Sequence, residues 1–487
     1  MSPPTAILAA IALPLLGVPL IALLGSRPNV RETVTLTTGG MLFLVVLSLA
    51  AEVFAGARPE IHLIEILPGL TLGFKIEPLG MLFALIASGL WIITSIYSIG
   101  YMRGHHEEQQ TRFYVFFAVA IAAVMGAAFA SNMLTLFIFY EVLTLSTYPL
   151  VTHHRTPEAM RGGRIYMGIL LSTSVGFLLL ALIWTWNIAG TLDFVPGGIL
   201  AGKTTNTAIG ILLALYVFGT GKAALMPFHR WLPAAMVAPT PVSALLHAVA
   251  VVKAGVFTVM KVVVYLFGID FLQGTGQHVW LLYVAGGTIL IASLVALTKD
   301  NLKARLAYST VSQLSYIVLG AALANSWGVI GGSMHIAMHA FGKITLFFCA
   351  GAILVATHKT EISDMKGIGR QMPFTMFAFL VGSLSIIGLP PFAGAWSKWY
   401  LILGAVHSEQ FFVVVVLIIS SLLNIAYLLP IVVNAFFAPV AAAEAEVGLK
   451  EAPLACVVPL LLTAVCCLVL FVYSDPLLDL VRRIGVF

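Results

Sequence analysis

The sequence predicts an all-α polytopic membrane protein with about fourteen transmembrane helices. Of its 487 residues, 60% are hydrophobic and only 9% are charged, whereas a typical soluble domain carries about 25% charged residues. Fourteen apolar stretches approach the ~20 residues that a helix needs to cross a bilayer. Lys and Arg are abundant in every second connection between these stretches and scarce in the others. These three observations predict a chain that lies almost wholly within a membrane.

The predicted spans follow one another through mostly short connections. The first lacks the basic residues that open a secretory signal, so we expect it to remain as a span. Only Ser131 and Asn132 separate the fourth span from the fifth. The eighth, eleventh, twelfth and thirteenth spans are long enough to be tilted or interrupted. The predicted limits are 5–24, 33–54, 77–98, 113–130, 132–151, 163–187, 207–226, 241–266, 278–297, 305–324, 330–355, 374–400, 411–437 and 453–473.

The distribution of cationic residues predicts the orientation of the chain. Fifteen of the 25 Lys and Arg residues fall in odd-numbered connections, five fall in even-numbered connections and the termini, and five lie inside spans. Because Lys and Arg accumulate in cytoplasmic loops, we expect the odd connections in the cytoplasm and both termini outside the inner (plasma) membrane. The net charge of +5 follows from this one-sided excess, so it does not indicate a nucleic-acid partner.

Two spans carry the pattern of a broken helix. In the seventh, two glycines and Pro227 surround Lys222, and in the twelfth the run GLPPFAG precedes Lys398. Proline removes a backbone donor and clashes with the preceding turn, so each helix is expected to unwind there. Paired interruptions in the two halves of a transporter point to its binding site.

The spacing of the two breaks predicts an internal repeat. Lys222 and Lys398 would each lie on the fourth helix of a five-helix unit, and an odd number of helices makes the two units inverted. The predicted organisation is three N-terminal helices, two such repeats, and a C-terminal helix with a short tail. The limits of these four segments are 1–112, 113–266, 278–437 and 453–487.

Six charged residues lie deep within the predicted spans. A charge at bilayer depth costs roughly 2.5–3.5 kcal/mol, so such residues usually line an ion or proton path. Lys222 and Glu141 are expected to pair, and separating them would change the affinity of the lysine for its proton; the alternative is a static pair that joins two helices. Lys261 lies near the outer end of its span and is expected to extend to the interface. The six residues are Glu141, Lys222, Lys253, Lys261, Lys343 and Lys398.

Histidines extend this row of titratable groups. His247 lies six residues before Lys253, and the alternative to a relay role is a satisfied core histidine. His335, His339 and Lys343 share one helix face at i, i+4 and i+8. Because imidazole titrates near pH 6.5, this face predicts a polar stripe along a proton path.

Several function classes lack support in the sequence. It contains no Walker motif, no Rossmann glycine fingerprint and no HExxH motif, and its four cysteines lie inside spans without metal-binding spacing. We therefore expect no nucleotide, metal or other cofactor, and no covalent chemistry. The histidine pairs at 105–106 and 153–154 fall in connections and are expected on solvated surface.

Long segments of the chain resemble the antiporter-like subunits that respiratory complex I shares with the Mrp multisubunit cation/proton antiporters. The resemblance covers residues 75–440 and rests on FYEVLTLSTYPLV, GKAALMPFHRWLPAAMVAPTPVSALLHAVAVVKAGVF, DNLKARLAYSTVSQLSYI, HIAMHAFGKITLFFCAGAI and MPFTMFAFLVGSLSIIGLPPFAGAWSKWYLILGA. It implies a buried proton axis, with proton transfer at Glu141, Lys222, Lys253 and Lys398 and relay through His247, His335, His339 and Lys343. The stretch from DMKGIGRQMPFTM to GLPPFAGAWSKWYL is most similar to the D subunit of Mrp antiporters.

The resemblance implies a proton-translocating subunit of a Na⁺/H⁺ antiporter, a secondary transporter subunit rather than an enzyme. Such a subunit works in the lipid bilayer beside other membrane subunits of a hetero-oligomeric complex, which exchanges H⁺ for Na⁺. A proton would move between Lys222 and Lys398 through Lys253. Two alternatives stay open: a proton-pumping subunit, M- or N-like, of a complex I-type NADH-quinone oxidoreductase or related membrane-bound hydrogenase, and a non-conducting scaffold.

Overall fold

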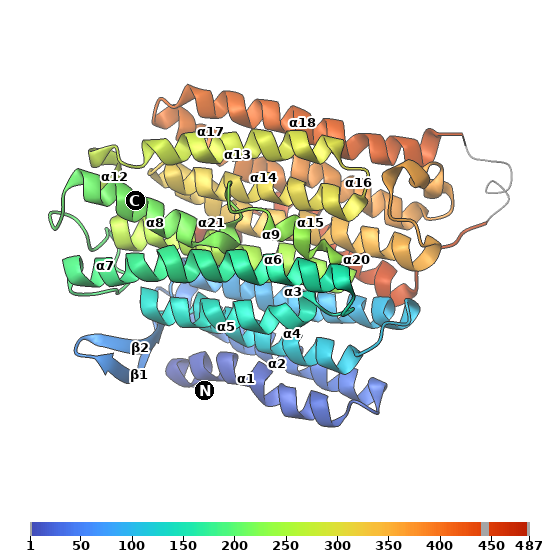
Figure 1. The fold of residues 1–487 in the computed structure, drawn as a ribbon, viewed down its shortest axis with the longest axis horizontal. Coiled ribbons are helices and arrows are strands. Elements are labelled where there is room, and N and C mark those ends of the chain that lie inside the picture. The colour runs from blue at the N-terminus through green and yellow to red at the C-terminus, as the bar shows by residue number, and fades with distance from the viewer. Residues whose placement is uncertain (1, 440–447, 485–487) are drawn as a thin grey trace.

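The computed structural model describes residues 2–439 and 448–484. It is a bundle of long, mutually aligned helices with one small β-hairpin at one end (Figure 1). Eleven of the described helices are long and apolar enough to cross a membrane, which confirms the all-α polytopic class. Of the three other predicted spans, two correspond to shorter apolar helices and one to the more polar helix Leu302–Ala322. Length and hydropathy therefore do not establish the predicted count of fourteen.

The first third of the chain forms helices interrupted only by the hairpin. Residues 55–76, which connect the second and third predicted spans, form two antiparallel strands that turn at Pro68 and Gly69. Asn132 begins the fifth helix, because its side chain accepts a hydrogen bond from the amide of Thr135 at 2.9 Å. The elements are α1 (Pro3–Leu23), α2 (Pro28–Phe54), β1 (Glu60–Leu67), β2 (Leu70–Lys75), α3 (Pro78–Gly104), α4 (Gln110–Ala128) and α5 (Met133–Val151).

The middle third is the least regular part of the bundle. Its helices contain π-helical turns at 174–178, 245–249 and 262–267, and 3₁₀ turns at 221–223 and 235–237. Thr156 and Thr205 cap the helices that follow them. The α-helical elements are α6 (Pro157–Thr173), α7 (Leu179–Ala189), α8 (Asn206–Gly219), α9 (Trp231–Ala234), α10 (Thr240–Ala244), α11 (Val251–Lys261) and α12 (Ile269–Thr275).

The last third returns to long helices. Asn301 and Asn325 cap two of them through their side-chain oxygens. Two 3₁₀ turns, at 362–365 and 368–370, occupy the connection after the longest helix. The helices are α13 (Val279–Thr298), α14 (Leu302–Ala322), α15 (Ser326–Thr357), α16 (Pro373–Ile387), α17 (Gly394–His407), α18 (Phe411–Phe437), α20 (Leu454–Val472) and α21 (Asp475–Arg482).

Both predicted helix breaks are present. α8 ends at Gly219, and the chain then passes through the 3₁₀ turn that contains Lys222 before α9 begins. α16 ends at Ile387, and α17 begins only at Gly394, four residues before Lys398. The proposed inversion of two five-helix repeats, and the segment limits drawn from it, stay predictions.

The titratable residues lie where the bundle is most deeply buried. The stretch Thr240–Phe267, which carries His247, Lys253 and Lys261, is entirely buried, whereas only about a third of the apolar window of α18 is. The outer faces of α18 and α20 instead expose apolar side chains such as Leu422 and Val458. The charges therefore occupy the centre of the protein and the apolar exterior suits lipid.

The two ends of the bundle differ in their polar contacts. At the hairpin end, the carbonyls of Arg483 and Ile484 accept hydrogen bonds from Arg58 and Tyr265, and α1 begins at this end too (Figure 1). At the opposite end, hydrogen bonds link the connections to one another. We call this the basic end; it comprises the connections at 24–27, 105–109, 152–156, 235–239, 299–301 and 358–372.

Candidate functional site

Lys222 sits in the break that follows α8, with its side chain directed at α5. Its Nζ donates to the backbone oxygen of Tyr140 at 2.8 Å and to the hydroxyl of Thr144 at 2.5 Å. The same nitrogen lies 3.0 Å from the centre of the Tyr140 ring. The unwound turn thus presents a fully buried amine to one face of α5.

Within the described part of the chain, Lys222 does not form the expected direct ion pair with Glu141. Both carboxylate oxygens of Glu141 are buried and have no hydrogen-bond donor among those residues. The reason lies in helix geometry. Residues 140 and 144 share one face of a helix, and residue 141 points about 100° away from it. A lysine bound to Tyr140 and Thr144 is therefore held off the carboxylate next to them.

A close backbone approach joins the Lys222 turn to the helix that carries Lys253. A β-carbon on Gly255 would lie 2.3 Å from the backbone carbonyl carbon of Lys222, so only glycine permits this contact. Lys253 lies two residues earlier on the same helix and is fully buried. The break and α11 therefore form one packed unit.

Lys253 contacts the histidine stripe of α15 directly. Its Nζ lies 2.5 Å from Nδ1 of His339, and the His339 ring centre lies 5.8 Å from that of His335, one turn away. Nδ1 of His335 is 2.8 Å from the hydroxyl of Ser397, the residue before Lys398. The predicted stripe thus lies between two buried lysines.

Tyr316 closes the gap between the stripe and Lys398. Its ring stacks on His335 with centres 5.4 Å apart, and Nζ of Lys398 lies 5.0 Å from the same ring centre. That amine donates to the carbonyl of Ile387, at the end of α16, and to Ser421. A β-carbon on Gly388 would lie 2.6 Å from Cδ of Lys398, so glycine at the break lets the lysine fold back across it.

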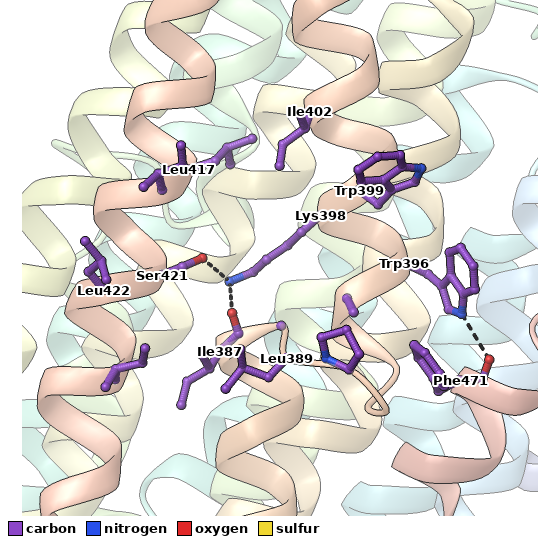
Figure 2. Close-up of a pocket in the computed structure, with 15 residues that line it drawn as sticks. Ile387, Leu389, Trp396, Lys398, Trp399, Ile402, Leu417, Ser421, Leu422 and Phe471 are labelled. Atoms are coloured by element: carbon purple, nitrogen blue, oxygen red, sulfur yellow. Dashed lines mark hydrogen bonds between the residues drawn. The ribbon is translucent and has the colours of Figure 1, made fainter.

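Lys398 borders a cavity of about 550 Å³ between α17, α18 and α20 (Figure 2). Apart from Lys398 and Ser421, the side chains that line it are apolar or aromatic. Trp399 and Leu422 at its edge are more than half exposed. The last lysine of the row therefore lies beside a space that opens towards the periphery of the bundle.

Lys343 begins a branch that runs to α14 and α18. Its Nζ donates to Ser309 at 2.5 Å, and the Ser309 hydroxyl lies 2.8 Å from that of Tyr427. The Tyr427 hydroxyl in turn donates to Asn424 at 2.5 Å. These hydroxyls link the amine to a third helix.

His247 packs against an aromatic ring rather than a polar partner. Its ring centre lies 4.5 Å from that of Phe347, and neither ring nitrogen has a hydrogen-bond partner among the described residues. The alternative of a satisfied core histidine is therefore not supported. A buried imidazole with two free nitrogens is able to take part in proton exchange.

Lys261 does not extend to the interface as expected. It is completely buried, and its Nζ lies 3.0 Å from Oε1 of Glu77 and 2.9 Å from the carbonyl of Ala130. The pair borders a cavity of about 260 Å³ at the hairpin end, which Arg58 and Arg483 also line. The sequence did not predict Glu77 as a buried partner, because it precedes Pro78 at the start of a span, where a solvated carboxylate is expected.

Sequence reasoning also missed the neutral partners of the row. Hydroxyl-bearing residues are common in any helix, and no motif singles out those that face a buried amine. Their positions become evident only once the helices are packed. They are Tyr140, Thr144, Ser309, Tyr316, Ser397, Ser421 and Tyr427. Within residues 2–439 and 448–484, no group of three or more His, Cys, Asp or Glu side chains is arranged to hold a metal ion.

Comparison with known families decides the class of protein. Residues 130–424 match the family described as NADH:quinone oxidoreductase/Mrp antiporter, TM, and residues 69–114 match the N-terminal segment of chain 5 of complex I. The chain belongs to the NADH:quinone oxidoreductase/Mrp antiporter family. The family match begins before α5 and ends within α18, so it includes every residue of the buried row.

Two relatives of this family member are subunits of quinone oxidoreductases. NADH-quinone oxidoreductase subunit N from Desulforudis audaxviator is 31% identical over 489 residues, covering 95% of each chain. NAD(P)H-quinone oxidoreductase chain 5 from Synechocystis sp. is 32% identical, but the match covers 68% of this chain and only 49% of that protein. This chain thus spans about half the length of its chain 5 relatives.

The fold of this family member is that of a chain in the Mrp complex from Dietzia sp. DQ12-45-1b. The TM-score is 0.88 over 100% of this chain and 97% of the other, at 22% identity. The predicted membership of the family that complex I shares with the Mrp antiporters is confirmed by the family match and by the subunit N relative. The assignment to the D subunit stays a prediction.

Proposed function

We propose that this chain is the D-type subunit of an Mrp-like Na⁺/H⁺ antiporter and carries protons along its buried row. Glu141, Lys222, Lys253 and Lys398 would transfer protons, and His247, His335, His339 and Lys343 would relay them. The observation that carries the proposal is the direct contact of Lys253 with His339, which begins a chain of contacts to Lys398.

The chemistry of the row suits proton exchange. An ammonium gives up a proton and a neutral amine or imidazole takes one, so each amine–imidazole contact is a site of transfer. Hydroxyls both donate and accept, so Ser397 and Ser309 extend the row without holding charge. The turn that carries Lys222 packs on α11 at Gly255. This contact places Lys222 against the helix that carries Lys253.

Glu141 would control the first step. In the described conformation Lys222 bonds to Tyr140 and Thr144, and the carboxylate of Glu141 lacks a donor. We take this as the separated form of the pair. Movement of Lys222 towards Glu141 would favour the ammonium, and its return would release the proton towards Lys253, since an opposite charge stabilises the charged form.

The proton path would cross the plasma membrane, with the basic end in the cytoplasm because Lys and Arg accumulate in its connections. Other membrane subunits of the complex would bind this chain and complete the exchange of H⁺ for Na⁺. A second candidate function is a proton-pumping subunit of a complex I-type enzyme. The 31% identity to a subunit N along nearly the whole of both chains favours that alternative.

The test uses everted membrane vesicles from cells that make the complete complex. We expect Lys222→Ala and Lys398→Ala to abolish Na⁺-dependent collapse of an imposed pH gradient. Lys203→Ala should leave it intact, because Lys203 is exposed at the hairpin end. Transport that survives both substitutions would leave only the scaffold role. Co-purification of iron–sulfur and flavin proteins with the chain would favour the redox alternative.

A further inference from the structure

A buried carboxylate at the basic end is surrounded by three imidazoles. Glu107, between α3 and α4, lies 3.1 Å from Nε2 of His154, 3.2 Å from Nδ1 of His105 and 3.9 Å from Nε2 of His153. The expectation that these histidines lie on solvated surface is wrong for His153, whose side chain is 2% exposed. His154 and His105 are about one-third exposed, so the cluster is buried on one side and wet on the other.

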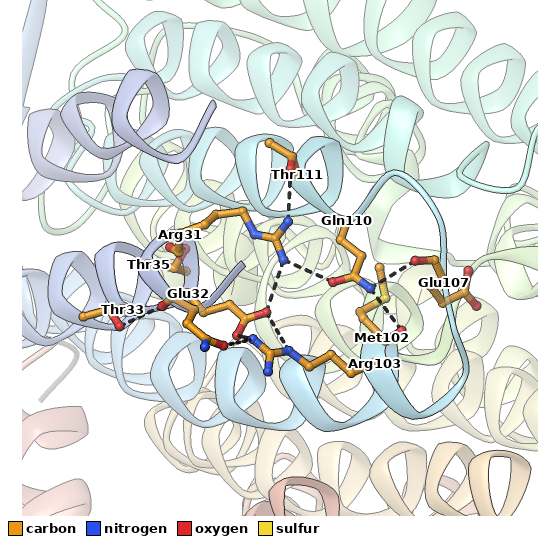
Figure 3. A network of polar contacts seen from close by, with 10 residues as sticks. Arg31, Glu32, Thr33, Thr35, Met102, Arg103, Glu107, Gln110 and Thr111 are labelled. Carbon is orange, nitrogen blue, oxygen red and sulfur yellow. Dashed lines mark hydrogen bonds and ion pairs between the residues drawn. The ribbon is translucent and has the colours of Figure 1, made fainter. Parts of the chain in front are cut away.

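The loop that carries Glu107 is fixed from behind. The side-chain amide of Gln110 donates to the backbone oxygens of Met102 and Glu107, and its oxygen accepts from Arg31 (Figure 3). Arg31 also contacts Glu32, which pairs with Arg103. These contacts hold the carboxylate in place without using its oxygens.

The cluster borders the start of the segment that carries His247. Nδ1 of His154 lies 3.2 Å from the carbonyl of Val237, and Nζ of the partly buried Lys303 donates to the next carbonyl, that of Ala238. The chain then enters α10 and the π-helical turn with His247. Ser243 of α10 carries a buried hydroxyl with no partner among the described residues, and the buried hydroxyl of Thr240 lies beside Tyr101. Buried hydroxyls thus continue from the cluster towards His247.

We propose that the Glu107–His154 pair, with His105 and His153, is a proton-collecting site that feeds the buried row through Lys303, α10 and His247. The inference rests on the proposed function and on the basic end facing the cytoplasm. The step conserves charge overall: the cluster takes one proton from solution at the exposed edge of His154 or His105. It passes one proton inward to His247 and returns to its starting state.

The ionisation of the cluster agrees with this role. Burial opposes ionisation of Glu107, but the hydrogen bond and charge of His154, with His153 and His105, hold its pKa below the ordinary 4.5. The hydrogen bond to Glu107 raises the pKa of His154 above 6.5, against burial and the charge of Lys303. Burial lowers the pKa of His153 to about 4, with Arg112 adding to the effect. The exchangeable proton therefore resides on the wet side of the cluster.

The chain offers matched controls beside each residue. Glu108 and His106 neighbour Glu107 and His105 in sequence, and both are exposed. In everted vesicles containing the whole complex, we expect Glu107→Gln to slow proton uptake at least about 10-fold in alkaline medium, where protons are scarce. In acidic medium the loss should shrink, and added formate, a small proton carrier, should restore the alkaline rate. Glu108→Gln should behave as the wild type.

The pattern of rates separates collection from mere support of the loop. If Glu107→Gln takes up protons more slowly only in alkaline medium, and formate restores its rate, the inference is supported. If its rate equals that of Glu108→Gln, the inference is overturned. The inference is also overturned if the rate falls equally at every pH and formate leaves it unchanged. If Glu107→Gln does not accumulate in membranes, His154→Asn against His106→Asn takes the same test. Lys222→Ala is measured in parallel. If both Lys222→Ala and Glu107→Gln retain transport, the proposed function has failed. If Lys222→Ala loses transport while Glu107→Gln retains it, only the proposed collecting site has failed.

Discussion

The buried pair of Glu77 and Lys261 should stabilise the hairpin end far more than an exposed pair nearby. Lys261 is fully buried, with its Nζ 3.0 Å from Glu77 and one carbonyl as the only further acceptor among residues 2–439 and 448–484. Glu77→Gln would leave the ammonium without its counter-charge. Removing one partner of a buried pair costs about 3–5 kcal/mol. We expect a loss near the lower limit, about 3 kcal/mol, because the glutamine oxygen still accepts a hydrogen bond.

The hairpin supplies the comparison. Glu60 and Lys75 lie 3.5 Å apart with side chains 50% and 39% exposed, and exposed pairs contribute only about 0.2–1 kcal/mol. Glu60→Gln should therefore cost at least about 2 kcal/mol less than Glu77→Gln. The double variant Glu77→Gln/Lys261→Met should recover most of the lost stability, because no buried charge remains unpaired.

The assay is equilibrium unfolding of the purified chain in mixed micelles titrated with SDS, followed by tryptophan fluorescence. A free energy of unfolding for Glu77→Gln within about 1 kcal/mol of that for Glu60→Gln would refute the reasoning. So would a double variant less stable than Glu77→Gln alone. Either result would mean that Lys261 finds other partners when the carboxylate is lost.

Three further predictions concern the row and the basic end. His339→Asn should lower proton flux at least about 10-fold, because it removes the only imidazole bonded to Lys253 within the described residues; flux is measured by dye quenching in vesicles. Ser309→Ala should lower flux less, by roughly 3-fold, because Lys343 keeps its contact with the carbonyl of Leu306. Protection of residues 104–110 against hydrogen exchange, corrected for the base-catalysed rise of the intrinsic exchange rate, should fall as pH rises above 6.5. The pKa of His154 is raised in the folded state, so the stabilisation that His154 provides is complete below pH 6.5 and is lost as pH rises through the raised pKa.

Each of these predictions has a matched control. His407→Asn, at an exposed histidine, should leave flux unchanged. Ser315→Ala alters a buried hydroxyl that, within the described part of the chain, bonds only to the carbonyl of Val311 in its own helix, so it should also have no effect. In His154→Asn, this corrected protection at 104–110 should no longer change between neutral and alkaline pH. Equal effects of a variant and its control would contradict the assigned contact.

The sequence was informative wherever one residue type dictates backbone shape. Glycine and proline predicted the breaks beside Lys222 and Lys398 because they disfavour a continuous helix. The expected direct contact of Lys222 with Glu141 is missing because the sequence does not show which face of α5 the turn meets. Tyr140 and Thr144 lie on the face that meets the turn, and Glu141 does not.

The hairpin was missed although its signal was present. The turn residues Pro68 and Gly69 separate two runs rich in apolar and β-branched residues, a pattern typical of paired strands. Because each run is far shorter than the ~20 residues of a membrane span, a prediction based on spans does not include the strands. The cluster around Glu107 could not be predicted, because its four members come from two connections that only the packing of α3, α4 and α5 brings together.

The central claim is that protons cross this chain through contiguous buried side chains, and Lys253 is the junction of the Lys222 turn and the histidine stripe. The most direct measurement is the initial rate of Na⁺-dependent proton movement in everted vesicles that carry Lys253→Met in an intact complex. We predict no movement above the level of vesicles lacking the complex. Movement at the wild-type rate would contradict the account, because no proton could then depend on this amine.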